Sequence, residues 1–266
     1  MKADYHVHTG FSYDTDTAPE KMIERAIELG FHRICITDHN DVDFPKKPNY
    51  TLVTEPYIKE LQRLQEVYKD KIDLRIGVEI GLQPHLGDFY REYAKKYPFD
   101  FIIGSVHAVD GKDPYIGELF PGRIDEEVYQ QTFETTLDCI KNISDFDVLG
   151  HIEYVVRYSN KKGDGYSYAA YADIIDEILK YLIEHGKGIE LNTASYKSGL
   201  NFCHPHPDII KRYKELGGEI ITVGSDGHKP EHFAYEFHRV KDILTSCGFK
   251  YYTEFVNRKP EFCTLL

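Results

Sequence analysis

Strand-like and helix-like segments alternate along this chain of 266 residues from one end to the other. Short apolar runs predict buried strands at residues 3–8, 33–37, 74–80, 101–106, 147–150, 188–191 and 219–223. Amphipathic stretches predict helices at residues 17–30, 55–69, 88–97, 125–143, 168–185, 207–217 and 232–246. Such alternation with short connections is typical of parallel strands joined by right-handed crossovers. The sequence therefore predicts seven βα units, either closed as a barrel or open and doubly wound.

The first helix and the segment after the second strand carry local signals. Thr17 and Glu20 have the spacing of a capping box, and Pro19 suits the first helical turn. We therefore expect Thr17 to cap the helix that ends at Gly30. Residues 40–54 are rich in proline and aspartate and predict a loop.

Ionisable side chains lie in or directly after six of the seven predicted strands, at the carboxyl end: His6 and His8, His39, Glu79, His107, His151, and Asp226 with His228. His6 and His8 face the same side because strand side chains alternate, although such a pair could also be two surface histidines. Parallel barrels carry their active sites at this end of the strands, with residues drawn from several strands. An open sheet would spread the same residues along a line. We therefore expect a closed or nearly closed barrel.

The amino-acid composition disfavours nucleic acid and membranes as binding partners. The chain has 44 acidic residues against 32 lysines and arginines, and the net charge of −12 disfavours a nucleic-acid-binding surface. Its five cysteines are far apart with no CxxC pair, which is typical of reduced thiols. We see no secretory signal and no apolar run long enough for a membrane span. We expect a cytoplasmic protein with no membrane or nucleic-acid partner.

The start of the chain resembles a known signature. His6-Val7-His8-Thr9, followed by Ser12 and Asp14, is similar to the HxH(S/T)…S..D motif of the PHP (polymerase and histidinol phosphatase) metallophosphoesterases. Later motifs of that family follow in the same order: Thr37-Asp38-His39, Glu79, Ser105-Val106-His107, Gly150-His151 and Gly224-Ser225-Asp226-Gly227-His228. The segments around Phe11, 107–111 and 190–193 most resemble the histidinol-phosphatase branch.

The resemblance extends from residue 4 to about residue 245. It implies an α/β fold, a distorted (β/α)7 TIM-like barrel that forms a single domain over residues 1–266. It also implies a cluster of two to three divalent metal ions. The nine implied ligands are His6, His8, Asp14, His39, Glu79, His107, His151, Asp226 and His228.

The same resemblance distributes these ligands over three sites. The first metal would be held by His6, His8, Glu79 and Asp226. Glu79 would bridge to a second metal held by His107 and His151, and the remaining three ligands would hold the third. Nitrogen and oxygen donors without thiolate suit Zn, Mn or Fe. Asp38 is interpreted as an outer residue that orients a ligand imidazole.

The implied chemistry is phosphate ester hydrolysis. Two cations bridged by a carboxylate lower the pKa of a shared water and supply a hydroxide nucleophile at neutral pH. Glu79, Asp226 and His228 are the expected catalytic residues, the last two as candidate acids for the leaving group. Arg157 and Lys197 lie in predicted loops and could bind the phosphate, although each could also be a solvated surface base.

The resemblance predicts an enzyme, a histidinol-phosphatase of histidine biosynthesis whose substrate is the small phosphorylated molecule L-histidinol phosphate. The alternative is a PHP-type phosphatase that acts on nucleotides, phosphotyrosine or general phosphomonoesters. A nuclease is disfavoured by the charge, and a non-enzymatic barrel by the complete ligand set. His204-Pro205-His206-Pro207 predicts a lead-in to the next helix, with lining of the substrate pocket as the alternative.

Overall fold

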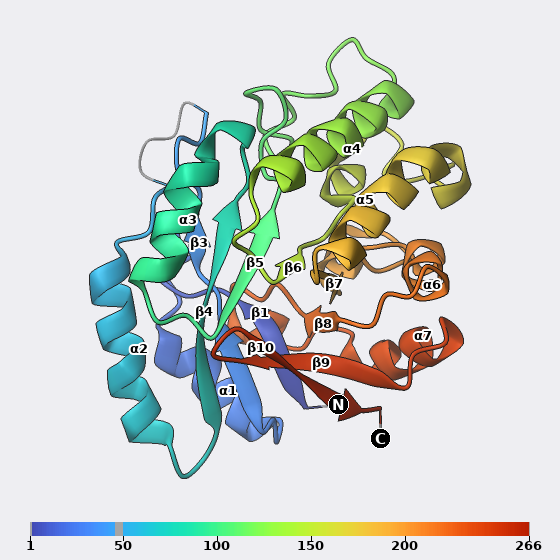
Figure 1. The fold of residues 1–266 in the computed structure, drawn as a ribbon. Helices are drawn as coiled ribbons and strands as arrows, with labels where there is room; N and C mark the ends of the chain where they lie inside the picture. Colours follow the sequence, from blue (N-terminus) through green and yellow to red (C-terminus); the bar gives the residue numbers. More distant parts are fainter. Residues whose placement is uncertain (1, 46–49, 266) are drawn as a thin grey trace.

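Seven parallel strands form the centre of the structure, a computed structural model that describes residues 2–45 and 50–265 (Figure 1). They are β1 (Ala3–Val7), β2 (Arg33–Ile36), β4 (Asp73–Gly81), β5 (Phe101–Ser105), β6 (Val148–Leu149), β7 (Gly188–Asn192) and β8 (Ile221–Gly224). The strands are neighbours in this order, and the short β3 (His39–Asn40) pairs with β4 beyond the end of β2. All seven predicted strands are therefore present.

The sheet closes where the carboxyl ends of β1 and β8 meet. Val7 forms a parallel bridge with Gly227, and the backbone N–H of His8 donates to the carbonyl of Gly227 at 2.9 Å. Nearer the start of β1, the Asp4 carboxylate accepts the backbone N–H of Ser225 at 3.0 Å. This closure confirms the predicted α/β fold class, a distorted (β/α)7 TIM-like barrel that forms a single domain. That the unit extends over residues 1–266 stays a prediction.

Helices surround the barrel, as Figure 1 shows. They are α1 (Pro19–Glu28), α2 (Thr54–Tyr68), α3 (Gly87–Lys96), α4 (Asp125–Asn142), α5 (Ala172–Glu184), α6 (Pro207–Glu215) and α7 (Val240–Ser246). Short 3-10 turns connect them: η1 (Pro84–Leu86), η2 (Tyr154–Tyr158), η3 (Tyr168–Tyr171), η4 (Ala194–Ser198), η5 (Pro230–His232) and η6 (Phe237–Arg239). Each helix that precedes a strand buries an apolar stripe; in α1 it consists of Met22, Ile23 and Ala26.

Two predictions about helix ends are wrong. Ala18 occupies the N-cap position of α1 and no side chain caps it, because the Thr17 hydroxyl donates to the carbonyl of His228 at 2.8 Å instead. The last helix begins at Val240 and not near residue 232. Ala234 and Glu236 have positive φ values of 54° and 58°, which a right-handed helix cannot contain.

A hairpin after α7 was not predicted. β9 (Tyr251–Val256) and β10 (Lys259–Thr264) pair antiparallel, and both residues of the intervening turn have positive φ. The hairpin, red in Figure 1, packs against the amino ends of the barrel strands. The Tyr5 hydroxyl donates to the carbonyl of Phe255 at 2.9 Å, and the Phe255 ring lies 5.0 Å from the ring of Phe101. The hairpin therefore covers the end of the barrel opposite the predicted site.

Two observations bear on the predictions made from composition. All five cysteines are free thiols. In the described ranges, no helix combines the length and the apolar character needed to cross a membrane. The cytoplasmic location stays a prediction.

The packing of the hairpin predicts unequal effects of two Phe→Ala substitutions. Phe255→Ala should lower the free energy of unfolding by about 3 kcal/mol, because truncation of a buried Phe removes its packing and leaves a cavity. Phe262→Ala, on the paired strand and 51% exposed, is the matched control and should change it by less than about 0.5 kcal/mol. Urea denaturation measures both. Equal and small effects would show that the hairpin does not support the barrel.

Candidate metal centre and active site

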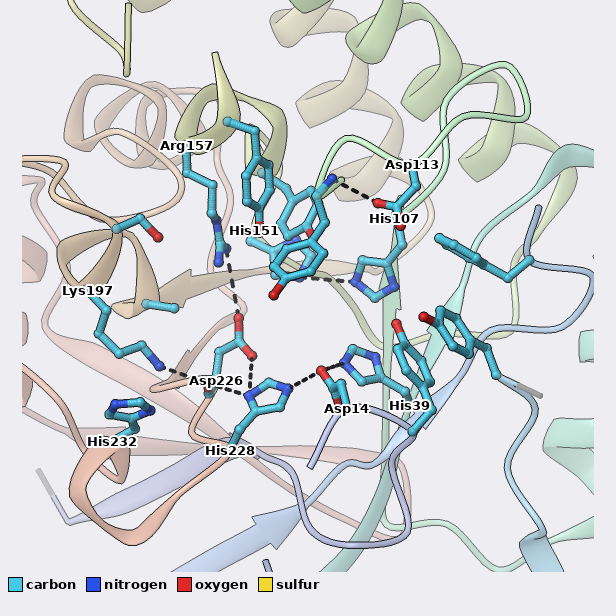
Figure 2. A pocket seen from close by; sticks show the side chains of 18 residues that line it. Asp14, His39, His107, Asp113, His151, Arg157, Lys197, Asp226, His228 and His232 are labelled. Atoms are coloured by element: carbon cyan, nitrogen blue, oxygen red, sulfur yellow. Dashed lines mark hydrogen bonds and ion pairs between the residues drawn. The ribbon is translucent and has the colours of Figure 1, made fainter. Parts of the chain in front are cut away.

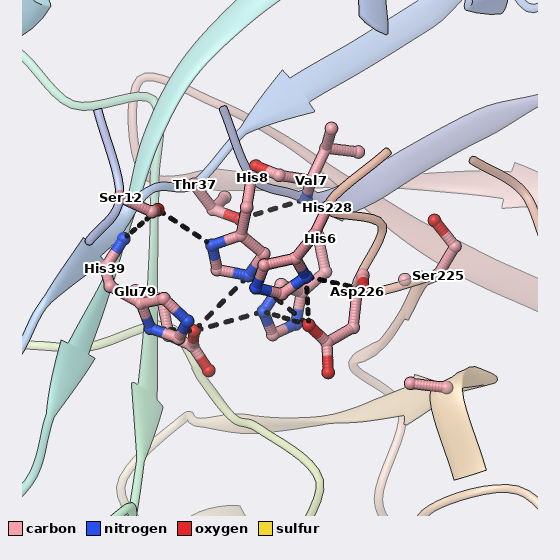
Figure 3. A network of polar contacts seen from close by, with 12 residues as sticks. His6, Val7, His8, Ser12, Thr37, His39, Glu79, Ser225, Asp226 and His228 are labelled. Carbon is pink, nitrogen blue, oxygen red and sulfur yellow. Dashed lines mark hydrogen bonds and ion pairs between the residues drawn. The ribbon is translucent and has the colours of Figure 1, made fainter. Parts of the chain in front are cut away.

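Glu79 lies at the centre of a group of buried imidazoles (Figure 3). It is near the carboxyl end of β4, fully buried, and its two oxygens face different rings. Oε2 is 3.2 Å from His6 Nε2 and 2.9 Å from His39 Nδ1. Oε1 is 3.2 Å from His107 Nε2 and 3.1 Å from His151 Nε2. Residues from four different βα units thus converge on one carboxylate.

Asp226 supplies a second carboxylate beside the same rings. It follows β8 with a φ of 51°, a conformation that turns the chain sharply at the strand end. Its Oδ1 is 3.4 Å from His8 Nε2 and 4.0 Å from His6 Nε2. His8 Nε2 is also 3.6 Å from Glu79 Oε2, so the four residues of the first predicted metal site are brought together.

Asp14 joins two further histidines at the cavity side of this group. Its Oδ2 is 2.8 Å from His228 Nε2 and 3.6 Å from His39 Nε2. The rings of His39 and His228 each stack on His8 with centroids 4.2 Å apart. The structure therefore brings all nine predicted ligands into one cluster. That each of them binds a metal stays a prediction.

Outer side chains fix the orientation of three of these rings. Glu190 Oε1 is 2.6 Å from His6 Nδ1, Asp41 Oδ1 is 2.9 Å from His107 Nδ1, and Ser12 Oγ is 3.2 Å from His8 Nδ1. Because the Nδ1 atoms are engaged in this way, the Nε2 atoms are directed at the two central carboxylates. This is the usual arrangement of histidines that bind metals.

Sequence reasoning did not assign Glu190 or Asp41 to the site. For Glu190 the available signal was a carboxylate inside the apolar strand β7, since an unpaired charge is seldom buried. Asp41 lies in the loop after β3, where no such signal exists. Asp38 is predicted to be an outer residue that orients a ligand imidazole. It accepts from the Thr9 hydroxyl at 2.7 Å and from the Ser12 hydroxyl at 2.6 Å, and Ser12 Oγ lies 3.2 Å from His8 Nδ1, so Asp38 is linked to the His8 ring through Ser12.

Two glycines leave room for the outer carboxylates. A Cβ on Gly224 would overlap both His6 Cβ and Glu190 Oε1, and a Cβ on Gly81 would overlap Asp41 Oδ1. Both glycines lie at the carboxyl ends of barrel strands, β8 and β4. Close approach of the outer carboxylates to the barrel thus depends on the absence of a side chain at these two positions.

The donor set of the cluster fits divalent metals. His6 Nε2, His8 Nε2 and Glu79 Oε2 are buried and have no hydrogen-bond partner among the described residues. Burial alone would raise the pKa of the Glu79 carboxyl, but His6 and His107 hold that pKa well below its usual range. Burial lowers the pKa of His8, and the neighbouring imidazoles lower it further, which favours the neutral ring that binds metals. Nitrogen and carboxylate donors of this kind suit Zn, Mn or Fe.

A cavity of about 420 Å³ opens beside the cluster (Figure 2). Arg157, on η2, is buried in its wall; its guanidinium carbon lies 4.6 Å from the centre of the Tyr154 ring, and Nη2 lies 3.8 Å from Asp226 Oδ2. Lys197, on η4, donates to the carbonyls of Ser225 at 3.3 Å and Asp226 at 3.0 Å. Burial lowers the pKa of Lys197. Both bases line the cavity, and their role in substrate binding stays a prediction.

The remaining walls contain residues that sequence reasoning missed. Asp113 lines the cavity from the loop after β5, and one of its oxygens accepts the backbone N–H of Tyr115 at 2.8 Å. Besides Tyr154, which the sequence offered as a possible neighbour of the pocket, five further aromatic rings line other parts of the wall: Tyr13, Phe44, Tyr50, Tyr115 and Tyr158. Loop residues such as these have no periodic pattern that could place them in the cavity in advance.

The chain is similar to known proteins over nearly its whole length. The PHP domain family matches residues 4–194. A histidinol-phosphatase of Lactococcus lactis is 32% identical over 249 residues, which cover 93% of this chain and 92% of that protein. A Clostridium acetobutylicum protein named probable histidinol-phosphatase is also 32% identical, over 94% of this chain and 95% of its own length.

A solved structure shares the fold and the length of the chain. The crystal structure of histidinol phosphate phosphatase from Lactococcus lactis, complexed with zinc, L-histidinol and phosphate, has a TM-score of 0.89 at 30% identity and covers 98% of both chains. The family match, the two relatives and this structure agree with the motifs that end the barrel strands. The chain therefore belongs to the PHP domain family.

Proposed function

We propose that this protein is a metal-dependent phosphomonoesterase that hydrolyses L-histidinol phosphate to L-histidinol and phosphate, a reaction of histidine biosynthesis. The observation that carries the proposal is the nine-residue donor cluster beside a cavity that also contains two buried bases. The names of the similar proteins and the L-histidinol and phosphate in the similar crystal structure support it. The five free thiols support the cytoplasmic location that we propose with it.

Two to three divalent ions (Zn, Mn or Fe) would be held by the nine side chains, with Glu79 shared between two of them. Zinc in the similar crystal structure supports this assignment. When bound, the ions supply Lewis acidity and lower the pKa of a water molecule. The protein itself contributes rigid donors, because Glu190 and Asp41 hold His6 and His107 in position.

Arg157 and Lys197 would bind the phosphate group. Phosphoryl transfer develops negative charge on the equatorial oxygens, and preorganised cations stabilise that charge. Arg157 is held with its guanidinium carbon over the Tyr154 ring, and a guanidinium suits bidentate contact with phosphate oxygens. Asp226 and His228 line the same cavity, and whichever of them a metal does not fully occupy is the group we assign to carry a proton toward the leaving alkoxide.

The opposite side of the cavity suits the organic half of the substrate. Figure 2 shows Arg157 and Lys197 on one side of the histidine rings and Asp113 on the other. Among the described lining residues, Asp113 is the one carboxylate outside the predicted ligand set. A carboxylate near aromatic rings matches the ammonium and imidazole groups of L-histidinol phosphate. A phosphomonoester without a cationic group would form no ion pair with Asp113.

The substrate proposal is tested with a panel of phosphate esters on the metal-loaded enzyme. The kcat/KM for L-histidinol phosphate should exceed those for p-nitrophenyl phosphate, a nucleoside monophosphate and phosphotyrosine by at least about tenfold, the size of one charge-assisted contact. Similar values for all four esters would favour a general phosphatase. Release of nucleotides from single-stranded DNA at physiological salt would favour a nuclease.

Removal of the central carboxylate should abolish activity. Glu79→Ala should lower kcat/KM by about 10³-fold or more, because two metal positions lose a shared ligand. Glu184→Ala, an exposed glutamate on α5, is the control and should keep full activity. Metal content, circular dichroism and steady-state kinetics are measured on both variants. A folded Glu79→Ala protein with normal activity would contradict the bridging role.

Substitution of Asp113 should lower kcat/KM only for substrates with a cationic organic group. Asp113→Asn should lower kcat/KM for L-histidinol phosphate by about 10- to 100-fold, the value of a charge-assisted hydrogen bond, and leave p-nitrophenyl phosphate nearly unchanged. Asp110→Asn is the matched control: it is exposed in the same loop, and asparagine tolerates its φ of 50°. An equal loss on both substrates would mean that Asp113 does not contact the organic half.

A further inference from the structure

A second group of buried polar side chains lies behind the cavity. It consists of Glu153, Tyr166 and His204, here called the Glu153 cluster. The Nε atom of Arg157 is buried beside it. Glu153 and His204 are 0% exposed, and no member of the cluster lines the cavity. The sequence had offered the His204-Pro205-His206-Pro207 segment either as a helix lead-in or as pocket lining. The segment leads into α6, and its first histidine is enclosed behind the pocket.

The contacts of the cluster join segments that are far apart in the sequence. Glu153 precedes η2, the turn that carries Arg157. One Glu153 oxygen, Oε1, accepts the backbone N–H of His206 and lies 3.6 Å from His204 Nδ1. The backbone of His204 is itself fixed, because it exchanges two hydrogen bonds with Asn192 at the end of β7. The cluster therefore links the loops after β6 and β7, which carry the two phosphate-binding bases of the proposed function.

Five buried atoms in this region have no hydrogen-bond partner among the described residues. They are Glu153 Oε2, Arg157 Nε, the Tyr166 hydroxyl, and both ring nitrogens of His204. The charge of Arg157 acts on both Glu153 and His204, and that of Glu153 acts on Tyr166, so these groups are neighbours. Buried polar atoms are almost always paired, either with protein or with ordered water. Concentration of so many unpaired atoms in one place indicates a mediator that fits between them.

The chemistry of these atoms identifies the mediator as water. Arg157 Nε can only donate, whereas the carboxyl of Glu153, the imidazole of His204 and the hydroxyl of Tyr166 can each accept. None of these atoms bonds directly to another one of them. A water molecule accepts from a guanidinium and donates to a carboxyl or imidazole, so it can satisfy both sides at once.

We infer that Glu153 and His204 are positioning residues for Arg157, and that they act through at least one ordered water held by the Glu153 cluster. The guanidinium carbon lies 4.6 Å from the centre of the Tyr154 ring, and Nη2 lies 3.8 Å from Asp226 Oδ2 on the cavity side. A water on Nε fixes the rotation of the guanidinium, so that the Nη donors face the phosphate. This inference rests on the phosphate-binding role proposed for Arg157. It does not depend on which alcohol the phosphate is attached to.

The test uses inorganic phosphate as the probe on the metal-loaded protein. Glu153→Gln should weaken phosphate binding, and raise KM for p-nitrophenyl phosphate more than it lowers kcat, by about 3- to 10-fold, the effect of one or two lost hydrogen bonds. Metal content should stay the same. Tyr166→Phe removes only a hydroxyl and should produce a smaller effect of the same kind, which keeps the test available if Glu153→Gln does not fold.

His206→Asn is the matched control from the same segment. Its ring accepts the N–H of Asp208 at the start of α6, a cap that asparagine can also provide, and packs against the ring of Phe202. Asparagine leaves Glu153, His204 and the Tyr166 hydroxyl in place, so phosphate affinity should not change. The double variant Glu153→Gln/Arg157→Lys should bind phosphate no more weakly than Arg157→Lys alone, because the effect passes through Arg157.

Two results would overturn the inference: unchanged phosphate affinity in both Glu153→Gln and Tyr166→Phe, or fully additive losses in the double variant. A purely structural role predicts additive losses. Because the probe is inorganic phosphate, a failure to hydrolyse L-histidinol phosphate would contradict the proposed substrate and leave this test intact.

Discussion

One buried carboxylate surrounded by five imidazole rings is the constraint on which the rest of this structure depends. The two oxygens of Glu79 lie within 3.6 Å of ring nitrogens from His6, His8, His39, His107 and His151. A single carboxylate cannot pair with so many rings, and burial makes unpaired lone pairs costly. Divalent cations resolve the conflict, since they take up the lone pairs of the rings and the charge of the carboxylate together. The donor geometry of the cluster therefore favours a metal centre.

The two ends of the barrel have different roles: one end is packed by the hairpin and stabilises the fold, and the other end carries the polar cluster. The same first strand carries Tyr5, whose hydroxyl donates to the terminal hairpin, and His6, whose ring lies 3.2 Å from Glu79 Oε2 in the donor cluster. At the hairpin end, Phe255 packs on Phe101, and Arg258 Nε lies 2.5 Å from the buried Asp147 carboxylate. Such packing allows the opposite end to hold a concentration of polar groups that would destabilise the fold on their own. This division is the usual one in parallel barrels.

Much of the site could be predicted because its ligands follow a local rule. Eight of the nine predicted ligands lie in or directly after the carboxyl end of a strand, and strand polarity then places them at one end of the barrel. Asp14 lies in the loop after β1 and was predicted from the family resemblance alone. The outer partners escaped prediction because they pair over long distances in sequence: Glu190 contacts His6 across 184 residues, and Asp41 contacts His107 across 66. The hairpin was missed because its turn residues, Asn257 and Arg258, adopt positive φ without the glycine that usually marks such a turn.

Anomalous X-ray diffraction from crystals of the zinc-loaded protein can show whether Glu79 is shared between two metals. We expect at least two anomalous peaks, one beside each oxygen of Glu79, with His6 and His8 at the first and His107 and His151 at the second. Peaks only at other places, or a fully zinc-loaded protein with no peak beside Glu79, would contradict it.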